Sequence, residues 1–115
     1  MNSTSRILTF IDVSRNSSSH YIINEDDEVI LCNTRPRPEG GIGSPLAITL
    51  PRAKRHEGRV LVIKDAGAYC AVNNITLQRQ GGDLIEGGNT HLLLTQPSSF
   101  KKLISDGDSW WYEIG

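Results

Sequence analysis

The chain has 115 residues, of which 37% are hydrophobic, and its 12 basic and 13 acidic side chains leave a formal net charge of −1. This length supports one domain with a modest core. The near-neutral charge excludes the overall field that draws a protein to nucleic acid or an anionic membrane, and it permits self-association. Because no apolar run could cross a bilayer and the first residues lack a secretion-signal pattern, we expect a protein made in a cytoplasm.

The beginning of the chain differs in character from the rest. Ile7–Val13 is apolar enough for a strand, and the serine-rich residues 14–19 that follow resemble a flexible linker. We therefore predict that residues 1–19 form an N-terminal arm or linker, which could dock on a neighbouring subunit. Residues 20–115 are predicted to form a single β domain.

Two strand candidates, Tyr21–Ile23 and Val29–Asn33, flank an acidic turn, and their spacing favours a hairpin. The acidic run Glu25–Glu28 could be read as a calcium loop, but it lacks the alternating ligands, the central glycine and the closing glutamate of an EF-hand. A solvated turn is the favoured interpretation, because charged clusters are usually exposed.

The segment Thr34–Pro45 is rich in proline and glycine, which exclude a helix and interrupt a strand ladder. A loop of this length is the best candidate in the sequence for a contact surface. After it, Leu46–Leu50 alternates like a half-buried strand and ends at Pro51. The basic run Arg52–His56 is too sparse and lacks the aromatic residues of a nucleic-acid site, so it is predicted to be a solvated turn.

The rest of the chain consists of short apolar runs separated by turns. The stretch Gly58–Gly87 contains two strand candidates, around Val60–Val62 and Ile75–Leu77, and further candidates follow at Leu84–Ile85, Leu92–Leu94, Phe100–Ile104 and Trp110–Ile114. The turn Ser105–Asp108 is a strong hairpin signal. Because turn residues recur about every 8–12 residues without a helical period, we predict an all-β fold, an antiparallel β-sandwich or jelly-roll-like meander.

No residue pattern indicates a cofactor or a metal. His20, His56 and His91 are far apart and have no second ligand at zinc spacing. Cys32 lies inside an apolar run, so free thiols at Cys32 and Cys70 are favoured over a disulfide.

Four carboxylates, those of Asp65, Asp83, Glu86 and Asp106, lie in or beside glycine turns. This placement favours the capping of turn amides over a glycosidase pair. A small glycan hydrolase stays open as an alternative, and it would require two carboxylates such as Asp83 and Glu86 to converge in a cleft.

Trp110, Trp111 and Tyr112 form the densest aromatic group. Successive side chains of a strand face opposite sides, so one tryptophan is expected in the core and the other toward solvent or a partner. These three residues are the predicted ligand-binding group, either as a subunit contact or as a platform on which a sugar stacks.

Several segments in order resemble a module of bacteriophage tail fibres and other viral fibre or spike proteins. They are Ile48–Pro51, then Gly58–Val60 with Val62–Asp65 and Gly67, then Asn73–Leu77, Gly82–Gly87 and Leu103–Gly107, followed by Trp111–Tyr112. The resemblance covers roughly residues 20–115, with Tyr21–Asn33 as the first hairpin of the module. The basic run Arg52–His56 and the loop Thr34–Pro45 depart from this pattern.

The resemblance implies a non-enzymatic virion protein that is β-structured and homotrimeric. Such modules lie at the distal part of a fibre, where they contact host-surface glycans or cap and register the trimer. Three copies around one axis would also cover strand edges that a lone subunit leaves open. No nucleic acid, membrane or cofactor is expected as a partner. The alternative is a carbohydrate-binding β-sandwich module that is not viral.

Overall fold

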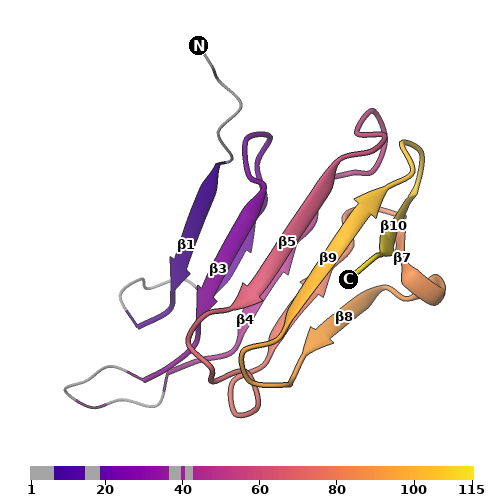
Figure 1. The fold of residues 1–115 in the computed structure, drawn as a ribbon. Coiled ribbons are helices and arrows are strands. Elements are labelled where there is room, and N and C mark those ends of the chain that lie inside the picture. The colour runs from indigo at the N-terminus through magenta and orange to yellow at the C-terminus, as the bar shows by residue number, and fades with distance from the viewer. Residues whose placement is uncertain (1–6, 15–18, 37–39, 41–42) are drawn as a thin grey trace.

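The computed structural model describes residues 7–14, 19–36, 40 and 43–115, and it confirms the all-β prediction (Figure 1). Helical structure in this part of the chain is limited to one 3₁₀ turn, η1 (Glu86–Gly88). The strands are β1 (Leu8–Asp12), β2 (His20–Ile22), β3 (Val29–Asn33), β4 (Leu46–Thr49), β5 (Val60–Asp65), β6 (Ile75–Gln78), β7 (Leu84–Ile85), β8 (His91–Leu94), β9 (Phe100–Ser105) and β10 (Trp110–Glu113).

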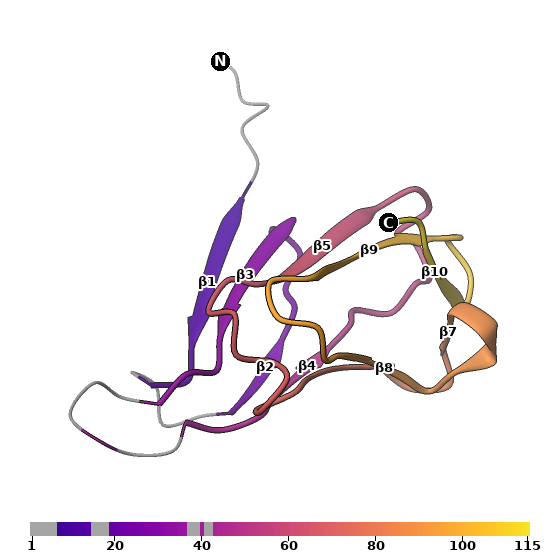
Figure 2. The ribbon, with the colours of Figure 1, turned by 60° about the horizontal axis from the view of Figure 1, so that its bottom comes forward.

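The strands form two sheets, which appear as two layers in Figure 2. The six-stranded sheet has the order β1-β3-β5-β9-β10-β7, and the four-stranded sheet has the order β2-β4-β6-β8. From β1 to β6 the chain alternates between the sheets, one strand at a time. Within each sheet the neighbours in this part of the chain are parallel, since each crossover passes through a strand of the other sheet. We call residues 8–78 the parallel winding.

The predicted antiparallel meander is wrong for the parallel winding. Strands β2 and β3 do not form the expected hairpin, because the acidic turn between them carries the chain from one sheet to the other. The hairpin was predicted from strand spacing and turn residues, which do not by themselves determine whether two successive strands pair with each other. Antiparallel pairing begins with β8 and β9, and the hairpin predicted at Ser105–Asp108 is confirmed as the β9–β10 turn. Gly107 adopts φ of 82° there, a value that favours glycine.

One hydrophobic core lies between the sheets. Each strand directs alternate side chains inward, as in β5, where Leu61 and Ile63 are fully buried and their neighbours are half-buried. Strand β4 does the same from the other sheet with Leu46 and Ile48. Burying an aliphatic side chain of this size contributes about 1.5–3 kcal/mol. These inward side chains are what hold the two sheets together.

The strand predicted at Ile7–Val13 is present as β1. It pairs with β3 of its own chain, with Leu8 opposite Val29 and Asp12 opposite Asn33. The division into an arm at residues 1–19 and a domain at residues 20–115 stays a prediction, and residues 1–6 and 15–18 lie outside the described part.

Candidate interaction surface

The three aromatic residues of β10 have different surroundings. Trp111 is fully buried, and its Nε1 donates a hydrogen bond of 2.9 Å to the carbonyl oxygen of Pro51. Trp110 and Tyr112 face the opposite side, where their rings stack with centroids 5.5 Å apart and planes 14° from parallel. The expectation that one tryptophan enters the core is confirmed. Because Trp111 is buried, only Trp110 and Tyr112 of the predicted ligand-binding group are accessible, and the binding role of the group stays a prediction.

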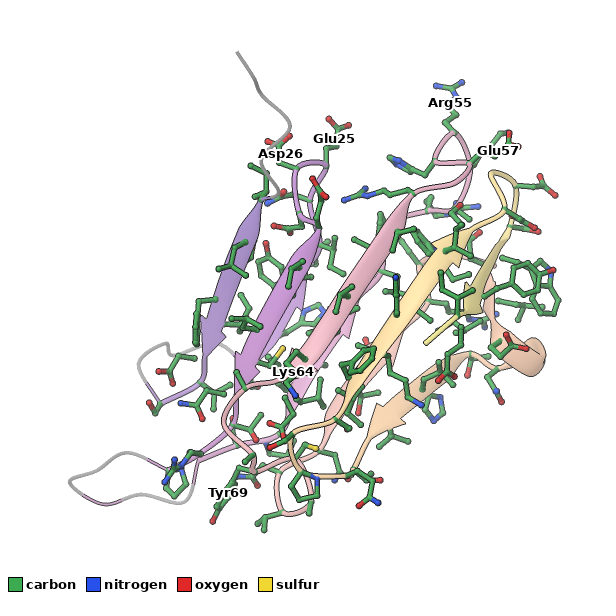
Figure 3. The ribbon with its side chains drawn as sticks, viewed as in Figure 1. Glu25, Asp26, Arg55, Glu57, Lys64 and Tyr69 are labelled. Carbon is green, nitrogen blue, oxygen red and sulfur yellow. The ribbon has the colours of Figure 1, made fainter. Side chains whose placement is uncertain are left out.

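Trp110 and Tyr112 belong to a larger apolar surface, the outward side of the six-stranded sheet, which faces the viewer in Figure 3. We call it the outer face. Its side chains are Leu8, Phe10, Val29, Leu31, Val60, Val62, Lys64, Leu84, Phe100, Lys102, Ile104, Trp110 and Tyr112. Branched aliphatic and aromatic residues predominate on it. At one end it becomes polar, with Asp12 beside Asn33.

The outer face is continuous across strands, because its residues stand opposite one another in register. Leu8 pairs with Val29, and Val29 pairs with Val62. On the other side of β9, Ile104 stands opposite Tyr112 of β10. Directly opposed apolar side chains contact each other and shield one another in part. This explains why most residues of the face are half-buried although no described strand covers them.

Two lysines interrupt the outer face. Lys64 is the penultimate residue of β5, and its Nζ donates a hydrogen bond to the carbonyl oxygen of Ser98, so its charge is held at the rim (Figure 3). Lys102 is exposed in the middle of β9, opposite Val62. Lysine stems are apolar and their ammonium groups can extend to water, so these residues are compatible with a covered surface.

The outward side of the four-stranded sheet provides an internal comparison. The strands there present Thr49, Thr76, Gln78 and His91 together with small or isolated apolar residues. Such a composition is usual for a sheet face in contact with water. The difference between the two outward sides therefore belongs to the six-stranded sheet alone and is not a general property of this chain.

A signal for the outer face was present in the sequence but was missed. The runs Val29–Cys32 and Val60–Ile63 are apolar at every position and do not alternate. Continuous apolar strands are typical of sheets that are covered on both sides. Sequence reasoning found the strands but did not use this distinction.

The carboxylates predicted to cap turns are confirmed in that role. Asp65 is buried and accepts hydrogen bonds from the backbone amides of Ser98 at 3.0 Å and Cys70 at 3.2 Å. Asp83 is also buried and accepts from the amide of Ala53 at 2.7 Å and from Arg52 Nε at 3.2 Å.

The other two carboxylates of this group also accept from the backbone. Glu86 Oε1 accepts from the amide of Glu113 at 3.1 Å. Asp106 Oδ1 accepts from three successive amides of the β9–β10 turn, those of residues 108, 109 and 110. Asp106 therefore caps its own turn, whereas Glu86 links η1 to β10.

The acidic turn between β2 and β3 is not solvated throughout, contrary to expectation. Glu25 and Asp26 point into solvent (Figure 3), but Asp27 is only 2% exposed. Its carboxylate accepts hydrogen bonds from the hydroxyls of Tyr21, at 2.6 Å, and Thr9. Burial would raise the pKa of Asp27, but these hydrogen bonds, an amide of the turn and the nearby Arg59 charge lower it below its usual value. The aspartate thus ties the turn to β1 and β2.

A shallow hollow of about 490 Å³ adjoins this turn. It is lined by Ile7, by residues 25–28 and by Gly58–Val60. Arg59 spans one side of it, and its Nη2 donates to the carbonyl oxygens of Asn24 and Asp27 at 2.7 and 2.9 Å. The polar groups here hold the turn in place.

Both cysteines are free and buried, which confirms the preference for thiols over a disulfide. Burial, with a smaller contribution from the charge of Asp65, raises the pKa of Cys32 to about 12. Burial and hydrogen bonding to Asp65 raise the pKa of Cys70 to about 11. Within the described residues, no three histidine, cysteine, aspartate or glutamate side chains come together as a set that could hold a metal ion.

The loop Thr34–Pro45, predicted as a contact surface, is described only at its ends. Thr34 Oγ1 donates to the carbonyl oxygen of Asn73, and Asn73 Nδ2 donates back to that of Thr34 at 3.0 Å. The loop is therefore fixed at its base to the turn before β6. Residues 37–39 and 41–42 lie outside the described part, so the contact role stays a prediction.

The basic run Arg52–His56 lies in the connection between β4 and β5. Arg52 pairs with Asp83, while Lys54 and Arg55 are exposed. Figure 3 shows Arg55 and Glu57 projecting from this connection away from both sheets. These positions fit the turn that was predicted.

The chain matches no family model and no curated protein. The similarity to fibre modules therefore rests on the residues quoted above. In the part of the chain that the structure describes, there is no helix with the length and apolarity to span a bilayer.

Proposed function

We propose that this protein is a non-enzymatic virion structural and attachment module, a β-sandwich that assembles as a homotrimer through its outer face. One observation carries the proposal. A two-layer β protein in water needs one apolar side per sheet, and the six-stranded sheet has two. A second apolar side is expected where another molecule covers it.

The size of the outer face supports a contact between subunits. If an exposed aromatic side chain offers about 200 Å², Leu8, Phe10, Phe100 and Tyr112 leave on the order of 400 Å² of apolar area in water. The half-buried neighbours bring the face to about 600 Å², at the upper end for the largest patch on a monomer. Stable interfaces bury about 800 Å² per partner, so the apolar area of the outer face corresponds to the larger part of one such interface.

The number of subunits rests on the resemblance to viral fibre modules. In a closed threefold assembly each subunit contacts two neighbours, and a broad sheet side turned toward the axis can meet both. The structural role follows from the same arrangement, because covering the outer face would make assembly part of the stability of each subunit.

The mass of the protein in solution tests this proposal. For a chain of 12.7 kDa, light scattering should give three times that mass at micromolar concentration. Val62→Lys puts a charge in the centre of the outer face and should yield monomers. The matched control is Thr76→Lys, which places the same charge on the outward side of the four-stranded sheet and should leave the trimer intact. A monomeric parent protein, or a Val62→Lys variant that stays trimeric, would refute the proposal.

A second candidate function, a carbohydrate-binding module that is not viral, is favoured by the stacked pair of Trp110 and Tyr112. Planar aromatic groups at a surface suit the apolar sides of sugar rings. Because this pair lies on the outer face, a subunit interface and a sugar would compete for it. Glycan binding by a monomer, lost in Tyr112→Ala and kept in Phe100→Ala, would favour this second function.

A further inference from the structure

Both sheets stop at the same end of the molecule, which we call the open end. In the described residues, β1 pairs only with β3 and β2 pairs only with β4. The two strands follow each other in the chain, and each is parallel to its neighbour. A terminal strand presents backbone N–H and C=O groups along its outer margin, which a further extended segment can bind.

Strand β1, with five residues, lacks most of the features that usually protect a sheet margin, whereas β2 is short, with three residues. Strands β1 and β2 contain no proline, and β1 carries one charged residue at its last position. Apolar side chains stand beside both margins, since Leu8, Phe10 and Ile22 are 61%, 60% and 58% exposed. Natural terminal strands are commonly short, charged or interrupted to prevent pairing with another chain.

The core also thins toward the open end. Ile11 and Val13, which face inward from the β1 side, are 8% exposed, and Ile23 on the β2 side is 4% exposed. The residues opposite Ile11 and Ile23 one strand further in, Cys32 and Leu50, are completely buried. Strands β1 and β2 cover the inward side chains of β3 and β4. One more strand on each sheet would cover the inward side chains of β1 and β2 in the same way.

The opposite end is closed by the chain itself, and Figure 1 shows β7 and η1 on the other side of the molecule from β1. Strand β7 has two residues, a length too short to recruit a partner strand. From it, η1 leads across to β8, and Ile85 and Asn89 bond each other's backbones at 2.8 and 2.9 Å. Repeat-like windings commonly need a cap of this kind at a terminus.

We infer that the open end is a docking site for one further parallel coil of polypeptide, which adds one strand beside β1 and one beside β2. Within the proposed function, on which this identification rests, the partner is the shaft of the fibre. A second copy of this chain fits less well. A twofold axis would bring β1 against β1 in antiparallel orientation, and the closed end offers no coil that could continue the winding head to tail.

A chain with a built-in extra coil tests the inference. Leu8 is paired with Val29, which lies 21 positions later, so a second copy of residues 8–28 inserted before Leu8 repeats that spacing. The added strands should slow hydrogen exchange at the backbone amides of the original β1 by about tenfold or more. The control carries Ile11→Pro and Tyr21→Pro in the added copy only. Both residues direct their backbone N–H toward the neighbouring strand, so the control removes ladder donors at equal length and should leave exchange at β1 unchanged.

If the enlarged chain does not fold by circular dichroism, a synthetic peptide of residues 8–23 added to the natural protein should give the same protection. Unchanged exchange at β1 with both additions would overturn the inference. It would also be overturned if β1 of the natural protein were protected at high concentration and lost this protection on dilution, since a second copy would then cover it. These measurements do not depend on trimer formation, so they can succeed or fail separately from the mass measurement.

Discussion

Asp65 offers the sharpest test of how this fold is held together. Its carboxylate lies at the end of β5, where it binds the turn before β6 and the turn before β9 at once. Oδ2 accepts from the amides of Cys70 and Ser98, and Oδ1 accepts from that of Tyr69 at 3.4 Å. One buried charge therefore fixes the turn that follows β5 and joins it to a segment 33 residues later in the chain.

Replacing this group by an amide, Asp65→Asn, keeps the shape but removes the charge and turns one acceptor into a donor. A hydrogen bond to a charged group contributes about 1.5–3 kcal/mol, and a neutral one about 0.5–1.5. In Asp65→Asn the hydrogen bonds from Cys70 and Ser98 become weaker, and the new amide N–H faces the N–H of Tyr69. Together these changes should lower the free energy of unfolding by about 2–3 kcal/mol. In urea the midpoint should fall by about 1–2 M at pH 7.

The effect should depend on pH in a defined direction. Burial alone would raise the pKa of Asp65, but hydrogen bonds from the Cys70 side chain and from backbone amides lower it below its usual value. A carboxyl whose pKa is lower in the folded state stabilises the protein fully above its unfolded value of about 3.9. This stabilisation is lost as the pH falls through the folded value, so the difference between parent and variant should shrink below about pH 4.

The matched control is Asp26→Asn, the same chemical change on an exposed side chain. It should change the free energy of unfolding by less than about 0.5 kcal/mol. Both variants are to be measured at one protein concentration, because an oligomer's stability depends on it. If Asp65→Asn matches this control at pH 7, or if its deficit is the same at pH 7 and pH 3, the assigned role of the buried charge is wrong.

Three further predictions follow from the structure. Cys32 and Cys70, with raised pKa values, should resist alkylation by iodoacetamide at pH 8 until urea unfolds the protein, and rapid labelling of the native state would contradict their burial. Trp111→Phe should cost about 2 kcal/mol in urea unfolding through lost packing and a lost indole hydrogen bond, and an unchanged midpoint would place this ring outside the core. Gly107→Ala should lower the free energy of unfolding by about 1–3 kcal/mol, because the φ of Gly107 is 82° and an added Cβ would lie 2.5 Å from the Cβ of Glu57. An unchanged stability in the same assay would exclude that turn geometry.

Much of the fold could be predicted from local patterns. Turn residues and alternating apolar positions gave the class and most strands, and the aspartate-glycine turn gave the β9–β10 hairpin. Strand direction could not be obtained in this way, because the partner of β3 is fixed by contacts with β1 and β5 and not by the adjacent turn. Residues 24–28 have the composition of a hairpin turn, but they connect β2 of one sheet to β3 of the other.

The candidate surface was predicted less completely. Alternation in β10 correctly separated Trp111 from its neighbours, but it gave no reason to group Tyr112 with Val62 or Leu8, which are distant in the chain. Asp27 was expected in solvent because acidic runs usually are exposed, and the structure buries it because Tyr21 and Thr9 supply donors from other strands. Contacts between residues distant in the chain depend on the tertiary structure, so local sequence patterns do not reveal them.

The alternation of the chain between two layers has a consequence for how the protein forms. Strands that lie side by side are separated by long intervals, since Val29 must meet Val62 and Ala47 must meet Thr76. The entropy cost of closing such long loops must be met before strand pairing stabilises the chain, so folding should be slow. A partly synthesised chain emerging from the ribosome would also expose β3 and β4 until β5 and β6 have been made.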